Sequence, residues 1–178
     1  VTTDVHTPDE AIMAAEYGID IIQIPAFLCR QTSLLKAAAQ TGRTINVKKG
    51  QFLAPEQMQF VVEKLLQFGA TMDKIILTER GTQFGYSDLI FDVRSIPKMK
   101  RLNVPVVLDV THSLQMPNQA CGVTGGDPSM IASLAAAGVA SGVDGIFVET
   151  HPRPQDALSD GSNMLPLDQM ESLICRII

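Results

Sequence analysis

Cysteine is scarce in this sequence of 178 residues, and Cys29, Cys121 and Cys175 show no CxxC spacing. An odd number of scattered cysteines argues against a disulfide framework or a zinc ribbon and is typical of reduced thiols in the cytoplasm. The longest charge-free run, residues 128–143, is too weakly apolar to span a bilayer. No signal peptide is visible at the start. We therefore expect a cytoplasmic protein.

Basic residues are also in deficit, with 14 Lys and Arg against 19 Asp and Glu, which gives a formal net charge of -5. Nucleic acids and anionic membranes require a basic face, so we expect neither as a partner. Hydrophobic residues make up 46% of the chain, enough for a globular core. Any anionic ligand must therefore be bound by a local group of cations.

The motifs of several large enzyme classes are missing. No GxGxxG or GxxxxGK[ST] follows an apolar run, which argues against dinucleotide and nucleoside-triphosphate binding. Ser87 and Ser113 lack the GxSxG turn that a hydrolase nucleophile needs. The chemistry must be sought elsewhere.

Short aliphatic runs alternate with helix-like segments along the whole chain. This alternation predicts parallel strands joined by right-handed helical crossovers. The predicted strands cover residues 1–6, 20–25, 45–49, 74–79, 104–110 and 144–149. The predicted helices cover residues 8–18, 31–41, 55–68, 87–102, 127–141 and 166–178.

Six such units fit either an open doubly wound sheet or a (β/α)8 barrel. Polar or charged residues end every predicted strand, whereas an open sheet concentrates its chemistry at one switch point. We therefore predict the α/β class and a TIM barrel with about six of its eight units present. The first residue is Val and the last lies within a predicted helix, so we expect a fragment, residues 1–178, of one catalytic barrel domain that carries strands 3 to 8.

Three residues are of types that bind a divalent transition metal. His112 and Glu149 follow predicted strands, and Asp160 lies in the last long loop. Imidazole nitrogen and carboxylate oxygen are common ligands of such ions. Spacing alone leaves open whether they bind a metal or are ordinary loop residues.

Cations follow two predicted strands. Lys48 and Lys49 end one strand and Arg80 follows the next, within the segment ERGTQFG. Its glycines allow backbone N–H groups to approach an anion. These cations could bind a phosphate or carboxylate, or they could be ordinary solvated charges at the ends of the strands, and the sequence favours neither. The role of Arg30 is also left open by the sequence. Cys29 has no neighbouring base, so we expect a packed thiol.

Five long segments resemble 3-deoxy-D-manno-octulosonate 8-phosphate synthases, and together they span almost the whole chain. They occur in the order expected for that family, at the spacing of barrel strands, and they differ from the related DAHP synthases. The segments are IIQIPAFLCRQT, INVKKGQFLAP, ILTERGTQFGY, LDVTHSLQMP and FVETHPRPQDALSDG.

The resemblance implies a transferase that condenses phosphoenolpyruvate with D-arabinose 5-phosphate and water. The products are 3-deoxy-D-manno-octulosonate 8-phosphate, a precursor of lipopolysaccharide, and inorganic phosphate. It also implies a homotetramer. Two anionic substrates would account for cations at strand ends in an acidic protein.

The resemblance also implies roles for individual residues. Residues matching Lys48, Arg80 and Ala26 surround the phosphoenolpyruvate phosphate, and Arg30 matches an arginine that reaches the pentose phosphate of a neighbouring subunit. Further expected substrate contacts are Asp4, Gln23 and His112. The expected catalytic residues are His112, Lys48 and Asp160.

His112, Glu149 and Asp160 match ligands of Zn, Fe or Mn in the metal-dependent members, whereas the metal-independent class needs no ion. The residue that separates the classes, a cysteine or an asparagine, lies in the family's first strand and not in this sequence. FLCRQT, TERGT and ALSDG look more like the metal-dependent members, so we expect a metal.

Three alternative functions stay open. A DAHP-type synthase would use the same condensation, and a Schiff-base aldolase would form an imine at Lys48, with Lys49 favouring the neutral amine. A barrel that only binds sugar phosphates would have no activity.

Overall fold

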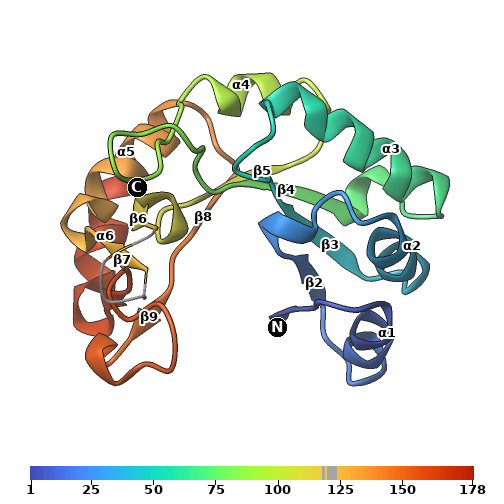
Figure 1. Cartoon of the computed structure of the whole chain (residues 1–178), viewed down its shortest axis with the longest axis horizontal. Helices are drawn as coiled ribbons and strands as arrows, with labels where there is room; N and C mark the ends of the chain where they lie inside the picture. The colour runs from blue at the N-terminus through green and yellow to red at the C-terminus, as the bar shows by residue number, and fades with distance from the viewer. Residues whose placement is uncertain (118, 120–123) are drawn as a thin grey trace. The chain divides into compact units, whose positions relative to one another are not determined.

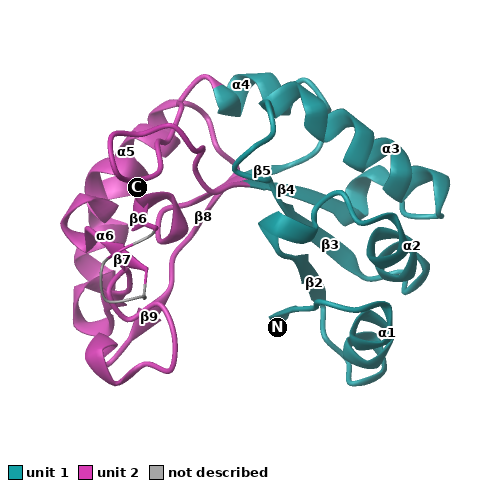
Figure 2. Ribbon diagram, viewed as in Figure 1, with its two compact units in different colours: residues 1–78, 95–106 teal, residues 79–94, 107–178 magenta. Residues whose placement is uncertain are grey.

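The structure is a computed structural model that describes residues 1–117, 119 and 124–178. It divides into two compact units, shown in Figure 2. Unit 1 contains residues 1–78 and 95–106, and unit 2 contains residues 79–94 and 107–178. Each unit is described separately below.

Unit 1 consists of repeated strand-then-helix segments. Helix α1 (Pro8–Glu16) begins where the Thr7 side chain accepts a hydrogen bond from the Glu10 backbone, with Pro8 at the first helical position. Short 3-10 turns at Ala26–Leu28, Pro55–Met58 and Met72–Lys74 precede other elements. The remaining elements are β1 (Thr2–Asp4), β2 (Ile21–Ile24), α2 (Thr32–Gln40), β3 (Thr44–Lys48), α3 (Gln59–Gln67), β4 (Ile75–Glu79) and α4 (Ser95–Lys100).

The strands of unit 1 pair in chain order, and every pair is parallel. β1 pairs with β2, β2 with β3, and β3 with β4. The Leu77 backbone N–H donates to Pro105 O, which brings the start of β5 (Val106–Asp109) beside β4. Figure 1 shows α1, α2 and α3 as successive neighbours along these strands.

Unit 2 contains the remainder of β5 and the strand that follows it. β5 pairs in parallel with β8 (Gly145–Phe147), and α5 (Ile131–Ala140) packs on both β8 and α6 (Met170–Ile177). Two small sheets lie in the loops after these strands. The first pairs β6 (Gln115–Met116) with β7 (Gly125–Gly126), and the second pairs β9 (Thr150–His151) with β10 (Leu165–Pro166).

These pairings give the strand order β1-β2-β3-β4-β5-β8, which follows the chain without reversal. A doubly wound sheet reverses its order at a switch point, whereas a barrel adds each strand beside the one before it. The predicted class is therefore confirmed: the fold is α/β, with six parallel βα units of the (β/α)8 type. The assignment of residues 1–178 to one catalytic domain stays a prediction.

Each unit has its own apolar core. In unit 1, the strands and helices each contribute fully buried apolar side chains, which include Ile22 of β2, Ile45 of β3, Leu35 of α2 and Leu65 of α3. In unit 2, Leu108 packs with apolar residues of α5 and α6. No helix in the described ranges is long and apolar enough to cross a membrane.

The predicted helix over residues 87–102 is wrong in its first half, because α4 begins only at Ser95. Thr82 and Ile90 form an antiparallel bridge, which closes the residues between them into a loop of bends instead of a helix. The Asp92 side chain then accepts hydrogen bonds from the Arg94 backbone at 3.0 Å and from Arg94 Nε at 2.8 Å. Hydrogen bonds between a side chain and the nearby backbone compete with helix formation, so α4 begins later in the chain than predicted.

Two adjacent leucines of α3 test the core of unit 1. Leu65 is 0% exposed and Leu66 is 39% exposed. We expect Leu65→Ala to lower the free energy of unfolding of the intact protein by about 2–5 kcal/mol, because it removes buried atoms and leaves a cavity. Leu66→Ala is the matched control, with an expected loss under about 1 kcal/mol. Equal losses in urea unfolding would contradict this packing.

Candidate functional site

A row of hydrogen-bonded polar side chains crosses the four strands of unit 1. Thr78 Oγ1 donates to Asn46 Oδ1 at 2.6 Å, and Asn46 Nδ2 donates to Gln23 Oε1 at 3.0 Å. Gln23 Nε2 donates in turn to Asp4 Oδ1. Gln23, Asn46 and Thr78 are buried and Asp4 is exposed. The predicted substrate contacts Asp4 and Gln23 are thus neighbours within one network.

Lys48 and Lys49 differ in their surroundings. Lys48 ends β3 two residues after Asn46, so its side chain leaves the same face of the strand as the polar row. Lys49 is 0% exposed, and its Nζ donates to the Gly50 carbonyl at 3.2 Å and to the Leu53 carbonyl at 3.3 Å. Lys49 therefore fixes the loop after β3, and Lys48 is the better candidate for ligand binding.

The segment after β2 places Ala26 and Arg30 differently. Ala26 is buried at the start of a 3-10 turn, and Arg30 is exposed. Cys29 between them is buried, and desolvation raises the pKa of its thiol, although the Gly50 backbone and the charges of Arg30 and Lys49 act in the opposite direction. The expected packed thiol is confirmed. Cys175 is exposed, and Cys121 lies outside the described residues.

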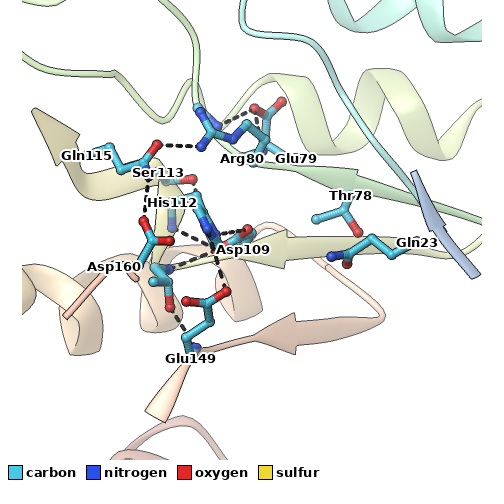
Figure 3. Close-up of polar contacts among 12 residues, drawn as sticks. Gln23, Thr78, Glu79, Arg80, Asp109, His112, Ser113, Gln115, Glu149 and Asp160 are labelled. Carbon is cyan, nitrogen blue, oxygen red and sulfur yellow. Dashed lines mark hydrogen bonds and ion pairs between the residues drawn. The ribbon is translucent and has the colours of Figure 1, made fainter. Parts of the chain in front are cut away.

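In unit 2, the three predicted metal ligands converge (Figure 3). One ligand atom from each of His112, Glu149 and Asp160 lies within 4.8 Å of the other two. His112 Nε2 is 3.6 Å from Glu149 Oε1. All three residues are partly buried. The sequence placed them on separate segments, and the fold brings them together.

Asp109, at the end of β5, orients His112. Its Oδ2 lies 2.8 Å from His112 Nδ1, and its Oδ1 accepts hydrogen bonds from the backbone N–H groups of Thr111 at 3.0 Å and His112 at 2.9 Å. An ionised carboxylate only accepts, so Nδ1 carries the proton. Nε2 then presents its lone pair toward the cluster, as a metal ligand requires.

Thr111 positions Glu149 in a similar way. Thr111 is 0% exposed, and its Oγ1 accepts a 2.7 Å hydrogen bond from the Glu149 backbone. The Val110 backbone N–H donates to Phe147 O at 3.0 Å, which continues the β5–β8 pairing past the end of β5. The ends of these two strands are therefore tied together where the histidine and the glutamate project.

Arg80 and Asp160 lie at opposite ends of a chain that passes through Gln115. Arg80 Nη2 donates to Gln115 Oε1 at 2.5 Å, and Gln115 Nε2 donates to Asp160 Oδ1 at 3.0 Å (Figure 3). Burial lowers the pKa of Arg80, and the carboxylates of Asp109, Glu79 and Asp160 partly offset that effect. The guanidinium stays charged at neutral pH. Arg80 Nη1 is buried and has no hydrogen-bond partner among the described residues.

The turn that carries Asp160 depends on a glycine. Asp160 has φ 52°, and its carbonyl accepts from the Asn163 backbone at 2.8 Å. Asn163 is 0% exposed, and its Nδ2 donates to Gly125 O at 3.3 Å. A Cβ on Gly126 would lie 1.4 Å from Asn163 Oδ1. The glycine of β7 therefore leaves the space in which Asn163 fixes this turn.

The donor set fits a divalent transition ion. One imidazole nitrogen and two carboxylates from three different segments lie within 4.8 Å of one another, so small side-chain movements would bring them to the usual distances of about 2.0–2.2 Å from a single ion. Asp109 supplies the hydrogen-bonded carboxylate that commonly orients a histidine ligand.

The site residues expected from the sequence do not include Asn46, Asp109 or Gln115, which belong to these networks. Asn46 alternates with Lys48 in the strand TINVK, so a period of two could have placed both on one face. Asp109 is one of the polar residues that end the predicted strands, and nothing else in the sequence marks it as a partner of His112. Gln115 lies in a loop, and nothing in its surrounding sequence indicates its two partners.

Parallel βα units with polar residues at the carboxyl ends of the strands are the arrangement of the (β/α)8-barrel class of α/β proteins. The DAHP synthetase I family model matches residues 1–177, and the chain belongs to this family.

Curated relatives are similar over nearly the whole chain. One is the 2-dehydro-3-deoxyphosphooctonate aldolase of Nitratidesulfovibrio vulgaris strain DP4, which is 56% identical over 98% of this chain and 63% of the relative. Proteins of the same name from Cyanothece sp. PCC 7425 and Rhizobium meliloti 1021 are 53% and 52% identical over 100% of this chain and over 64% and 62% of their own lengths. The chain thus spans somewhat less than two thirds of the relatives it matches.

The orientation of His112 can be tested by Asp109→Asn. The amide can present N–H instead of an acceptor to Nδ1, so we expect the ring to move its proton to Nε2. Nitrogen-15 NMR of the histidine side chain in the metal-free protein distinguishes the two tautomers. Asp168→Asn, at an exposed position, is the control and should leave the ring unchanged. An Nδ1–H ring that survives Asp109→Asn would show that Asp109 does not set the tautomer.

Proposed function

We propose that the protein containing this chain condenses phosphoenolpyruvate with D-arabinose 5-phosphate and water, which gives 3-deoxy-D-manno-octulosonate 8-phosphate and inorganic phosphate. The observation that carries the proposal is the 52–56% identity to relatives named 2-dehydro-3-deoxyphosphooctonate aldolase, which extends over 98–100% of the chain. The polar groups at successive strand ends support it, because the reaction needs many polar contacts at one end of a barrel.

In this proposal, C3 of phosphoenolpyruvate attacks the aldehyde carbon of the open-chain pentose phosphate. The aldehyde oxygen takes up a proton and becomes a hydroxyl group. Water adds at C2 and gives up one proton, which balances the proton taken up by the aldehyde oxygen. The bond between C2 and the phosphate ester oxygen then breaks, so inorganic phosphate leaves with that oxygen and takes the proton of the new C2 hydroxyl group, and the oxygen from water remains on C2 as the ketone oxygen. The products contain every atom of the two substrates and of one water. No covalent intermediate with the enzyme is required, which agrees with Cys29 as a buried, protonated thiol.

Lys48 and Arg80 each contribute a cation to phosphoenolpyruvate binding. Arg80 is suited to this role because its buried guanidinium has one nitrogen, Nη1, without a partner among the described residues. A planar guanidinium binds phosphate through charge-assisted hydrogen bonds, and burial strengthens them. Lys48, a compact charge at the end of β3, offsets negative charge on the substrate and is one of the three proposed catalytic residues.

The remaining substrate contacts follow from the resemblance. Asp4 and Gln23 would orient substrate hydroxyl or carbonyl groups, since they already share a hydrogen bond at neighbouring strand ends. Ala26 would approach the phosphate of phosphoenolpyruvate through its backbone. Arg30, whose side chain is exposed, would bind the pentose phosphate of a neighbouring subunit in a homotetramer.

His112, Glu149 and Asp160 would hold a divalent ion, either Zn, Fe or Mn. Such an ion supplies positive charge that polarises an oxygen of the substrate or of water. His112 would bind through Nε2 because Asp109 holds the proton on Nδ1. Asp160 is already held through Oδ1 by Gln115, so its carboxylate is oriented before any ligand arrives.

We also propose a cytoplasmic location, where exposed Cys175 would stay reduced.

Release of inorganic phosphate by the intact protein tests the proposal. We expect release that requires both substrates and equals the loss of phosphoenolpyruvate. A barrel that only binds sugar phosphates would release none. Release with erythrose 4-phosphate in place of arabinose 5-phosphate would indicate a DAHP-type synthase. Borohydride trapping of an adduct on Lys48 would indicate a Schiff-base aldolase.

Arg80→Ala should raise the KM for phosphoenolpyruvate and lower kcat. A charge-assisted hydrogen bond contributes about 1.5–3 kcal/mol, so kcat/KM should fall roughly 10- to 100-fold or more. Arg94→Ala is the matched control, because Arg94 is exposed and paired with Asp92. Steady-state kinetics that match the unaltered protein would place Arg80 outside the phosphate site.

A further inference from the structure

We propose that Gln115 is a positioning residue that couples anion binding at Arg80 to metal binding at His112, Glu149 and Asp160. The inference rests on the proposed function and assigns a role within the same site. All residues of the network belong to unit 2, and every contact that carries the inference joins two of them.

The Gln115 amide has only one orientation that satisfies both partners. The arginine side chain only donates hydrogen bonds, and an ionised carboxylate only accepts them. Gln115 Oε1 must therefore face Arg80 Nη2, at 2.5 Å, and Nε2 must face Asp160 Oδ1, at 3.0 Å. If the amide were reversed, its NH₂ group would face the donors of Arg80 and its oxygen would face the carboxylate oxygen of Asp160. The amide is therefore held in the orientation described.

The Gln115 backbone is also held in place. Its carbonyl accepts a 3.1 Å hydrogen bond from the Leu89 backbone, and its strand β6 pairs with Gly126 of β7. Gln115 lies three residues after His112, at the end of the 3-10 turn His112–Leu114. The residue that contacts Asp160 is therefore attached through a short, ordered segment to another proposed metal ligand.

Each end of the amide prepares one binding group. At one end, Gln115 donates to Asp160 Oδ1 and restricts the orientations open to the carboxylate before an ion binds. At the other end it holds Nη2 of Arg80, and the buried Nη1 has no partner in the part of the chain that the structure describes. Nη1 is therefore the donor that an incoming anion would meet.

Binding at one end should strengthen binding at the other. An ion on Asp160 fixes the carboxylate and thereby the amide and the guanidinium, so an anion that arrives later has less to order. The same coupling must act in reverse, because the free energy that links two binding events is reciprocal. We expect the metal to raise the affinity for the anion about 5-fold or more, and the anion to raise the affinity for the metal equally.

Gln115→Met tests the inference, because methionine has a similar length and cannot make either hydrogen bond. Mn²⁺ is titrated into the metal-free intact protein, with and without phosphoenolpyruvate, and free Mn²⁺ is measured by electron paramagnetic resonance. Protein-free titrations correct for the complex of Mn²⁺ with phosphoenolpyruvate. Calorimetry of phosphoenolpyruvate binding, with and without Mn²⁺, measures the effect of the metal on the affinity for the anion.

We expect Gln115→Met to weaken Mn²⁺ binding about 10- to 100-fold, in the range found when a residue that orients a metal ligand is changed. It should also weaken phosphoenolpyruvate binding to the metal-free protein and abolish the mutual enhancement. Gln169→Met, at an exposed position of the same unit, is the matched control and should change none of these values. Thermal unfolding of each variant reports whether it folds.

Gln115→Glu is a second variant that keeps the size and reverses the chemistry at one end. Its carboxylate still accepts from Arg80 but adds a negative charge beside Asp160, so phosphoenolpyruvate binding should fall further than in Gln115→Met, whereas Mn²⁺ binding should fall less because the added charge attracts the cation. If the unaltered protein binds no Mn²⁺, the proposed metal site fails. If it binds both ligands, and the variants retain the same affinities and enhancement, the role of Gln115 is overturned while the proposed function stands.

Discussion

The proposed metal site depends on the 2.8 Å hydrogen bond between Asp109 and His112 Nδ1. Asp109 is buried at the end of β5, and its carboxylate also accepts from the backbone N–H groups of Thr111 and His112. Three hydrogen bonds offset the cost of burying this charge. They also fix the imidazole so that Nε2 faces Glu149. The strand end therefore determines both the backbone turn and the tautomer of the histidine.

The buried cation of unit 2, Arg80, is surrounded by carboxylates. Arg80 is held among carboxylates of Glu79, Asp109 and Asp160, each of which acts against the effect of burial on its pKa. Glu79 Oε1 accepts from the backbone N–H groups of Arg80 and Gly81, at 3.0 and 2.9 Å, and so shapes the turn from which Arg80 projects. An acidic protein can thus present a cation to an anionic substrate without a basic surface.

The sequence predicted the fold well because its apolar runs are short, aliphatic and separated by helix signals. Five predicted helices begin or end within a few residues of the observed positions when their initial 3-10 turns are included, whereas the segment 87–94 follows local bonds of Asp92 that periodicity does not reveal. The convergence of His112, Glu149 and Asp160 was expected from family resemblance, and spacing alone left it open. Gln115 could not be predicted, because its role depends on contacts 35 and 45 residues away in the chain.

The roles of the unit 1 residues rest on chain position and resemblance. Lys48, Asp4 and Gln23 lie at or near strand ends, and the hydrogen-bonded row from Thr78 to Asp4 shows how four strands orient polar groups before any ligand is present. Lys49 shows that a charged residue at a strand end need not bind a ligand. Its ammonium group is buried against two carbonyl groups, which residue type could not indicate.

The most direct test of the metal site is removal of the metal from the intact protein. The protein is treated with a chelator, its metal content is measured by elemental analysis, and phosphate release from both substrates is assayed before and after Mn²⁺ or Zn²⁺ is added. We predict that activity disappears with the metal and returns on addition, and that Asp160→Asn prevents the return. Activity that survives complete metal removal would contradict the account and would assign His112, Glu149 and Asp160 to a hydrogen-bonded substrate and water network.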